Sequence, residues 1–115
     1  MTDKLRYHKT AERPDSKLWL LDDDGTLINF ATGYTFTFKI GRRGTAAVLT
    51  KTSGILGTAG AGAEPDGDPN VTIVYSAGEF AAVAPSPSYR WQLTATTGGL
   101  DRVFEGGFEL VEVIL

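Results

Sequence analysis

Cysteine is absent from this chain of 115 residues. Without thiols there is neither a disulfide nor a thiolate metal site, which argues against a disulfide-stabilised extracellular module. Histidine occurs once, as His8, so the chain cannot assemble a cluster of histidine ligands. No stretch approaches the roughly 18 apolar residues that span a bilayer, and residues 1–17 lack the apolar core of a signal peptide. We therefore expect a protein made in the cytoplasm, with no membrane contact and no cofactor.

Charge of either sign is also limited, with 11 basic and 14 acidic side chains and a net charge of −3. Residues 1–17 have an excess of positive charge, whereas residues 18–115 are acidic. An acidic body repels a phosphate backbone, so we do not expect nucleic acid as a partner. The length and the 42% hydrophobic content fit one domain around one core.

Alternation of apolar and polar residues is the clearest pattern in the chain. It runs through residues 34–40, 71–76 and 89–96, and its period of two is that of a strand with one buried face. Turn-forming residues separate the alternating runs, and strands joined by short turns pair antiparallel. The pattern predicts an all-β, immunoglobulin-like antiparallel β-sandwich of about seven strands, with Trp91 in its core. A long final strand from Arg102 contains Gly106-Gly107, which indicates a bulge or bend.

Three segments fall outside this alternation. Residues 1–16 show no periodicity and end in turn formers, so we expect an extended N-terminal arm, with the sandwich domain at residues 17–115. The arm is either a loosely ordered terminus or a segment that orders on a neighbouring subunit. Residues 53–70 are rich in glycine and alanine and predict a long flexible hairpin loop. Residues 77–83 could form one helical turn before Pro85.

An Asp-Asp-Asp-Gly-Thr-Leu string at residues 22–27 follows a short apolar run. It resembles the first motif of the haloacid-dehalogenase-like phosphatases, which implies a nucleophile at Asp22 and a general acid or base at Asp24, with Mg²⁺ between them. That family also needs a helix after the string and a second acidic pair after a later strand. Here the string leads into strand periodicity, and Asp66–Asp68 lies in the predicted loop. We therefore favour a solvated turn and expect no catalytic residue.

Other site patterns are incomplete. The acidic turn Asp22–Asp24 could hold Ca²⁺ weakly but lacks the spacing of an EF-hand loop. No Lys-Ser or Lys-Thr pair follows the glycines of residues 54–62, so they do not form a phosphate-binding loop. Arg42 and Arg43 form a basic turn that is too small for a nucleic-acid patch. We expect no metal site.

The order of these features resembles a known family. An apolar strand, an Asp-x-x-Gly turn, the segment to Asn29-Phe30 and an aromatic alternating strand after Gly33 come first. A variable loop, the strand at residues 71–75, a short turn at 78–83 and two final strands follow. This order is similar to that of the immunoglobulin-like N-terminal domain of the upper baseplate proteins (BppU type) of tailed bacteriophages, over residues 17–113. The resemblance implies a virion structural protein of the tail or baseplate.

Binding of other proteins is therefore the expected function. The partners would be other virion structural proteins, with a homo-oligomer within the particle, and the alternatives within the particle are capsid decoration and a head–tail connector. The candidate partner-binding residues are Arg6, Tyr7, Lys9, Arg13, Trp19, Arg42 and Arg43. A carbohydrate- or receptor-binding module is a further alternative, because sandwiches often bind ligands on their loops. Its candidate stacking residues are Tyr7, Trp19 and Tyr34.

Overall fold

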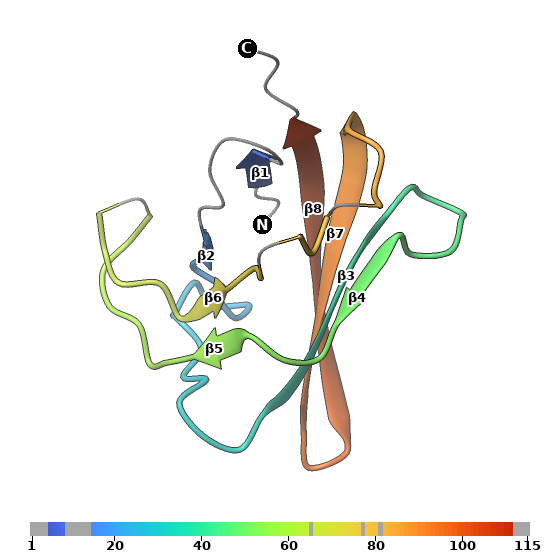
Figure 1. Cartoon of the computed structure of the whole chain (residues 1–115). Coiled ribbons are helices and arrows are strands. Elements are labelled where there is room, and N and C mark those ends of the chain that lie inside the picture. Colours follow the sequence, from blue (N-terminus) through green and yellow to red (C-terminus); the bar gives the residue numbers. More distant parts are fainter. Residues whose placement is uncertain (1–4, 9–14, 65, 77, 81, 112–115) are drawn as a thin grey trace.

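The chain folds into two β-sheets in a computed structural model (Figure 1). The structure describes residues 5–8, 15–64, 66–76, 78–80 and 82–111, except for the side chains of residues 6–8 and 111. The larger sheet has the order β1 (Leu5–His8), β8 (Leu100–Val111), β7 (Ser86–Thr97), β3 (Thr35–Gly41) and β4 (Leu49–Lys51). The smaller sheet has the order β2 (Ser16–Leu18), β6 (Val71–Ile73) and β5 (Ile55–Gly57). The described residues contain no helix, and so none that could cross a membrane.

The order of the strands is that of an immunoglobulin-type sandwich. All pairs are antiparallel except β1, which lies parallel to β8. Strands β8-β7-β3-β4 occupy the positions of strands G-F-C-C′ of an immunoglobulin-type sandwich, and β2-β6-β5 occupy those of B-E-D. The predicted all-β sandwich of about seven strands is thus confirmed.

The core lies between the two sheets and is filled from the alternating strands. Trp91 on β7 is 1% exposed, and its ring stacks on that of Phe38 from β3 at 6.3 Å between centroids. Gly106 on β8 lies directly opposite Trp91, so no cross-strand side chain competes with the indole on the inner face. The predicted bulge at Gly106-Gly107 is wrong, because pairing continues without a shift through this point. The irregularity lies instead between Ser86 and Tyr89.

A tyrosine fixes the entry into β7. The hydroxyl of Tyr89 donates a hydrogen bond of 2.7 Å to the carbonyl of Ala84, and the ring is buried. A tyrosine near the start of strand F that bonds back to upstream backbone is the tyrosine corner of immunoglobulin-type sandwiches. Trp91 follows two residues later, where antibody domains have a disulfide cysteine. An indole therefore fills the centre of this cysteine-free core.

Polar side chains hold the smaller sheet together, because its strands have only three residues each. Asn70 is fully buried and accepts a hydrogen bond from the Leu20 N–H at 2.8 Å. Its amide donates to the carbonyls of Leu20 and Ile28 at 2.8 and 2.9 Å. Asn70 thereby supplies hydrogen bonds that a regular strand ladder would otherwise provide.

Several sequence-based boundaries need correction. Residues 5–8 and 16 belong to strands β1 and β2, so this part of the predicted arm is integrated into the sandwich. The predicted loop at 53–70 contains strand β5 and a second, tight hairpin closed by the Ala61–Asp68 bridge. The described residues of 77–83 form turns, with Val83 N–H bonded to the Phe80 carbonyl, and no helix.

Candidate functional site: a basic groove beside the β3–β4 turn

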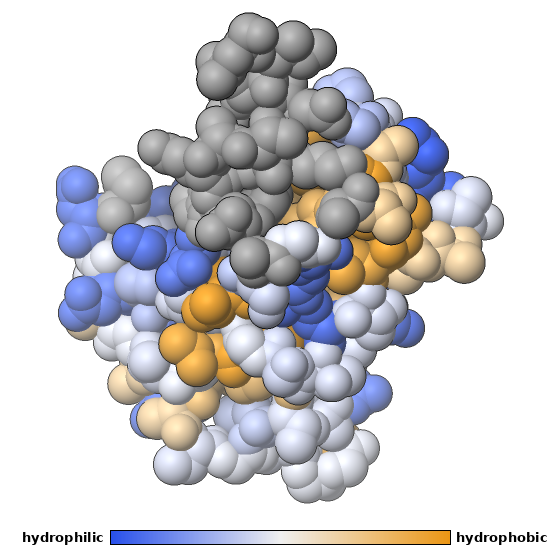
Figure 2. Space-filling model, viewed as in Figure 1, coloured by the Kyte–Doolittle hydropathy of each residue, from blue (hydrophilic) through white to orange (hydrophobic). Residues whose placement is uncertain are grey.

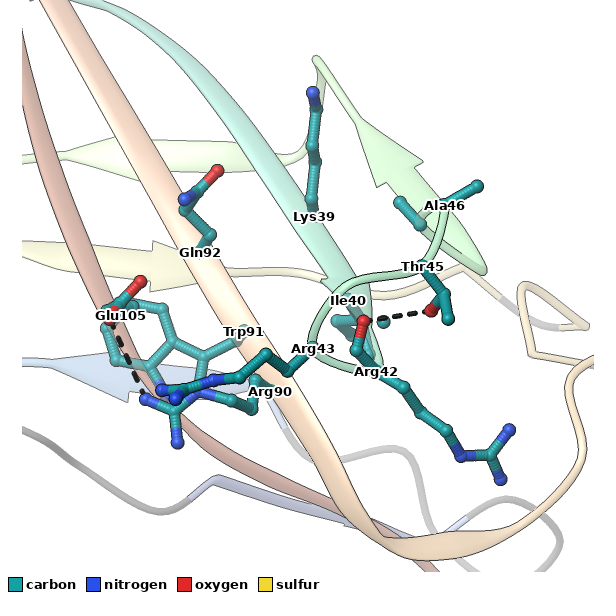
Figure 3. Close-up of a pocket in the computed structure, with 12 residues that line it drawn as sticks. Lys39, Ile40, Arg42, Arg43, Thr45, Ala46, Arg90, Trp91, Gln92 and Glu105 are labelled. Atoms are coloured by element: carbon teal, nitrogen blue, oxygen red, sulfur yellow. Dashed lines mark hydrogen bonds and ion pairs between the residues drawn. The ribbon is translucent and has the colours of Figure 1, made fainter.

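A groove of about 390 Å³ lies where the β3–β4 turn meets the outer face of the larger sheet (Figure 3). Its lining comes from strands β3, β7 and β8 and from the turn: Lys39–Arg43, Thr45–Ala47, Arg90–Gln92 and Glu105. Four of these side chains are cationic and one is a carboxylate. Residues 18–115 contain six basic residues in all, so most of the positive charge of this acidic region gathers in one place.

Glycines shape the turn that forms one wall. The Thr45 N–H and hydroxyl both donate to the Arg42 carbonyl, at 3.1 and 2.9 Å, which closes a four-residue turn. Gly44 has a φ of +79°, the left-handed conformation that a type II turn needs at its third position. A side chain at Gly41 would lie 3.1 Å from the Ala47 backbone, so glycine lets residues 46–47 return close to the sheet. The turn therefore folds over the end of β3.

Register brings the remaining cations to the turn. Gly41 pairs with Arg90, and Lys39 pairs with Gln92, so Lys39 and Arg90 lie on the outer face of adjacent strands. In Figure 3 the side chains of Arg43 and Arg90 extend in the same direction, whereas Arg42 points away. Arg42 lies over the Tyr89 ring, 5.0 Å from its centroid, and is held by a cation–π contact.

Charge in the groove is only partly compensated. Arg90 and Glu105 approach to 3.8 Å, but both side chains are at least one third exposed, so this ion pair is loose and worth little. Lys39 and Arg43 make no ion pair or hydrogen bond with the described residues through their side chains. Arginine presents a planar set of donors that matches a carboxylate in a bidentate manner. The groove is thus suited to bind carboxylates from a partner.

Two of the groove residues, Arg42 and Arg43, were predicted from the sequence, and two, Lys39 and Arg90, were missed. The missed pair has a recognisable signal, because both are outward-facing polar members of the two clearest alternating strands. Lys39 precedes the basic turn by only three residues. Placing Arg90 beside it requires the register of β3 against β7, which a single sequence does not supply.

Of the other predicted partner-binding residues, Trp19 is the one whose side chain the structure describes, and it does not line the groove. Trp19 is 7% exposed, so its ring is not a surface platform, and the expectation that it is open for stacking is wrong. Its Nε1 has no hydrogen-bond partner among the described residues. The side chains of Arg6 and Tyr7, and all of Lys9 and Arg13, lie outside the described residues.

The acidic string forms a self-contained turn. The Asp22 carboxylate accepts hydrogen bonds from the N–H groups of Asp24 and Thr26, at 3.2 and 3.1 Å, and a bridge joins Leu21 to Leu27. Hydrogen bonds with the Asp22 carboxyl and from Thr26 hold the pKa of Asp24 below its usual range. A lowered pKa keeps this carboxylate ionised and is unsuited to a general acid at neutral pH. The parallel sheet with helices that the phosphatase resemblance implies is not the fold of the described chain.

A second hollow of about 470 Å³ borders the start of β3 and is lined by Tyr34–Thr37, Thr52 and Ile55. The Tyr34 ring is half-buried, meets the Phe30 ring edge-on at 4.8 Å and stacks with Phe36 at 6.3 Å. These contacts fix Tyr34 as the outer member of an aromatic cluster. Of the three predicted stacking residues it is the one that lines a hollow in the described structure.

Comparisons with protein-family models, with curated proteins and with solved structures found no match to this chain. Among the described residues, no group of three or more histidine, aspartate or glutamate side chains lies close enough to hold a metal ion.

Proposed function

We propose that this chain is a structural protein of a tailed-bacteriophage particle, and that it binds other virion proteins through the basic groove. The observation that supports protein binding most is the gathering of Lys39, Arg43 and Arg90 around a hollow on an otherwise acidic domain. Lys39 and Arg43 leave their charge unmatched, so an acidic surface that docks there gains electrostatic complementarity.

The placement in a phage particle rests on the resemblance to the immunoglobulin-like domain of upper baseplate proteins. That domain type and the sandwich described above share an all-β architecture. A rigid sandwich with charged turns suits assembly, because loops on a stable scaffold can contact neighbours without distorting the core. Tail or baseplate is the proposed location, with capsid decoration and a head–tail connector as the other positions in the particle.

Particle composition tests the proposal. Mass spectrometry of purified particles from the phage that encodes this chain should detect it in several copies. A Lys39→Glu/Arg43→Glu variant should enter particles at a reduced level, because the groove then repels an acidic partner. Absence of the wild-type chain from particles would overturn the proposed function.

A matched control separates the groove from net charge. Lys17→Glu/Arg102→Glu makes the same change in net charge at two exposed positions away from the groove. This variant should enter particles as the wild type does. Equal loss of both variants would show that net charge, and not the groove, controls incorporation.

A carbohydrate-binding function is the second candidate, and the observation that favours it is Tyr34 at the second hollow. A glycan array reports on it directly. Binding that is lost on Tyr34→Ala would favour a receptor-binding role, and an array without signal would dispose of it.

A further inference from the structure

The described residues 61–64 and 66–68 form an acidic hairpin, within the segment that the sequence predicted to be a flexible loop. The N–H and carbonyl groups of Ala61 and Asp68 bond to each other at 3.0 and 2.6 Å, and the Gly67 N–H bonds to the Ala63 carbonyl at 2.7 Å. Glu64, Asp66 and Asp68 are all exposed, and no basic residue occurs in this stretch. The hairpin is thus a narrow projection whose charged side chains are all acidic.

The root of the acidic hairpin is fixed to the sandwich. The Thr58 N–H bonds to the Asn70 carbonyl at 2.9 Å, and the Thr58 hydroxyl donates to the Pro69 carbonyl at 2.8 Å. Asn70 is itself buried and bonded to two neighbouring segments. A projection anchored in this way loses little conformational freedom when it binds, which favours association.

Acidic hairpin and basic groove lie far apart in one molecule. In Figure 1 the segment between β5 and β6 stands at the left edge, whereas the β3–β4 turn stands at the right edge. Figure 2, in the same view, shows mainly hydrophilic residues at the left edge and a mixture of hydrophilic and hydrophobic residues at the right edge. Because the two segments stand at opposite edges of the sandwich, the hairpin does not reach the groove of its own chain. Any contact between these two surfaces must join two copies.

We propose that the acidic hairpin of one copy docks into the basic groove of the next, so that the chain self-assembles head to tail. The occupant of the groove is then a second copy of this chain, which deepens the proposed function by naming the partner at the same site. Asp66 and Asp68 supply the carboxylates, and Lys39 and Arg43 supply the unmatched cations. Because the two surfaces differ, the contact is heterologous and generates a ring if it closes or a filament if it does not.

Salt dependence is the first measurement. Sedimentation velocity of the whole chain at increasing concentration should show reversible association near 0.1 M NaCl. The association should weaken at least about tenfold near 1 M NaCl, because the Debye length falls from about 10 Å to about 3 Å. A chain that stays monomeric at low salt throughout the concentration series would overturn the inference. Association that does not depend on salt would overturn it as well.

Charge reversal on each side is the decisive test. Lys39→Glu/Arg43→Glu makes the groove acidic, and Asp66→Lys/Asp68→Lys makes the hairpin basic. Each variant alone should be monomeric, since its hairpin and groove then have the same sign. An equimolar mixture should associate again, because each hairpin meets a groove of opposite sign.

The remaining outcomes of the charge reversal are also informative. Circular dichroism and thermal unfolding that match the wild type show that both variants are folded, and the Lys17→Glu/Arg102→Glu variant should associate as the wild type does. Variants that associate alone, or a mixture that stays monomeric, would overturn the inference. Because these are measurements in solution, their failure leaves the presence of the chain in particles as a separate test of the proposed function.

Discussion

The two sheets of this sandwich are stabilised in different ways. In the larger sheet, the hairpin of β7 and β8 pairs from residue 86 to residue 110 with one irregularity, and aromatic rings fill its inner face. In the smaller sheet each strand has three residues, and Asn70 supplies hydrogen bonds between segments. The difference teaches that a short-stranded sheet needs buried polar side chains where a long one relies on packing.

The two proposed binding surfaces are also divided between the two sheets. The basic groove is built on the outer face and turn of the larger sheet, whereas the acidic hairpin rises from a connection of the smaller sheet. The groove is supported by the aromatic packing of the larger sheet, and the root of the hairpin is bonded to Asn70 beside the smaller sheet. Substitutions in the aromatic core and at Asn70 therefore test the stability of the two sheets separately.

Loss of the central indole should have the largest effect. Trp91→Ala removes the largest fully buried side chain and leaves a cavity beside Phe38. We expect the free energy of unfolding to fall by about 3–5 kcal/mol, measured by urea denaturation. A loss below about 1 kcal/mol would contradict the view that packing stabilises the larger sheet.

Loss of the buried amide tests the smaller sheet. Asn70→Ala leaves the Leu20 N–H and the Ile28 carbonyl without this partner and removes one of the two donors to the Leu20 carbonyl, which still accepts from the Ile28 N–H. Because unpaired buried groups are costly, the free energy of unfolding should fall by about 3 kcal/mol. The control is Asn29→Ala, since Asn29 is exposed and its side chain bonds, among the described residues, only to the Ala31 N–H. Equal losses in the two variants would show that burial of the amide is not what matters.

An ion pair ties β4 to the connection between β6 and β7 and should rank third. The Lys51 ammonium on β4 lies 2.6 Å from a Glu79 carboxylate oxygen, with the two side chains 5% and 16% exposed. Glu79→Gln leaves the buried ammonium without its counter-charge and should cost about 2 kcal/mol of stability. Replacing both residues, as Lys51→Met/Glu79→Leu, should cost less than the single change. The comparison is a urea denaturation of the wild type and both variants, and a larger loss of stability in the double variant would refute it.

The tyrosine corner should have the smallest effect on stability. Tyr89→Phe keeps the buried ring and removes the hydrogen bond to the Ala84 carbonyl. We expect a loss of about 1 kcal/mol in the same denaturation experiment. An unchanged stability would mean that the start of β7 is held by packing alone.

Most of the larger sheet could be predicted from the sequence, and the smaller one in part. Strands β3, β6 and β7 were predicted because apolar residues repeat at every second position, as they do through Phe36, Phe38 and Ile40. Strand β8 was predicted as a long final strand. Strand β5 is three residues long and ends at Gly57, which is too short to show a period. Strand β1 has four residues, and its parallel pairing with β8 joins residues about 100 apart in sequence. Pairing over such distances depends on the whole fold.

The candidate site was predicted at its turn and missed at its strands. Arg42 and Arg43 are adjacent in sequence, so their joint charge is visible without a structure. Arg90 reaches them through the pairing of Gly41 with Arg90, which only the register of the sheet sets. Exposure of Trp19 was predicted wrongly because an aromatic residue next to a turn has the same sequence pattern whether it is covered or open.

Cross-linking in the particle tests the central claim most directly. A photo-reactive side chain at position 46, which is exposed and lines the groove, leaves all four cations in place. The same group at position 100, which is 73% exposed beside the β7–β8 turn, is the control. In purified particles, position 46 should cross-link to a virion protein in far higher yield than position 100. Equal yields at both positions, or no cross-link from position 46, would contradict the assignment of the groove as the binding surface.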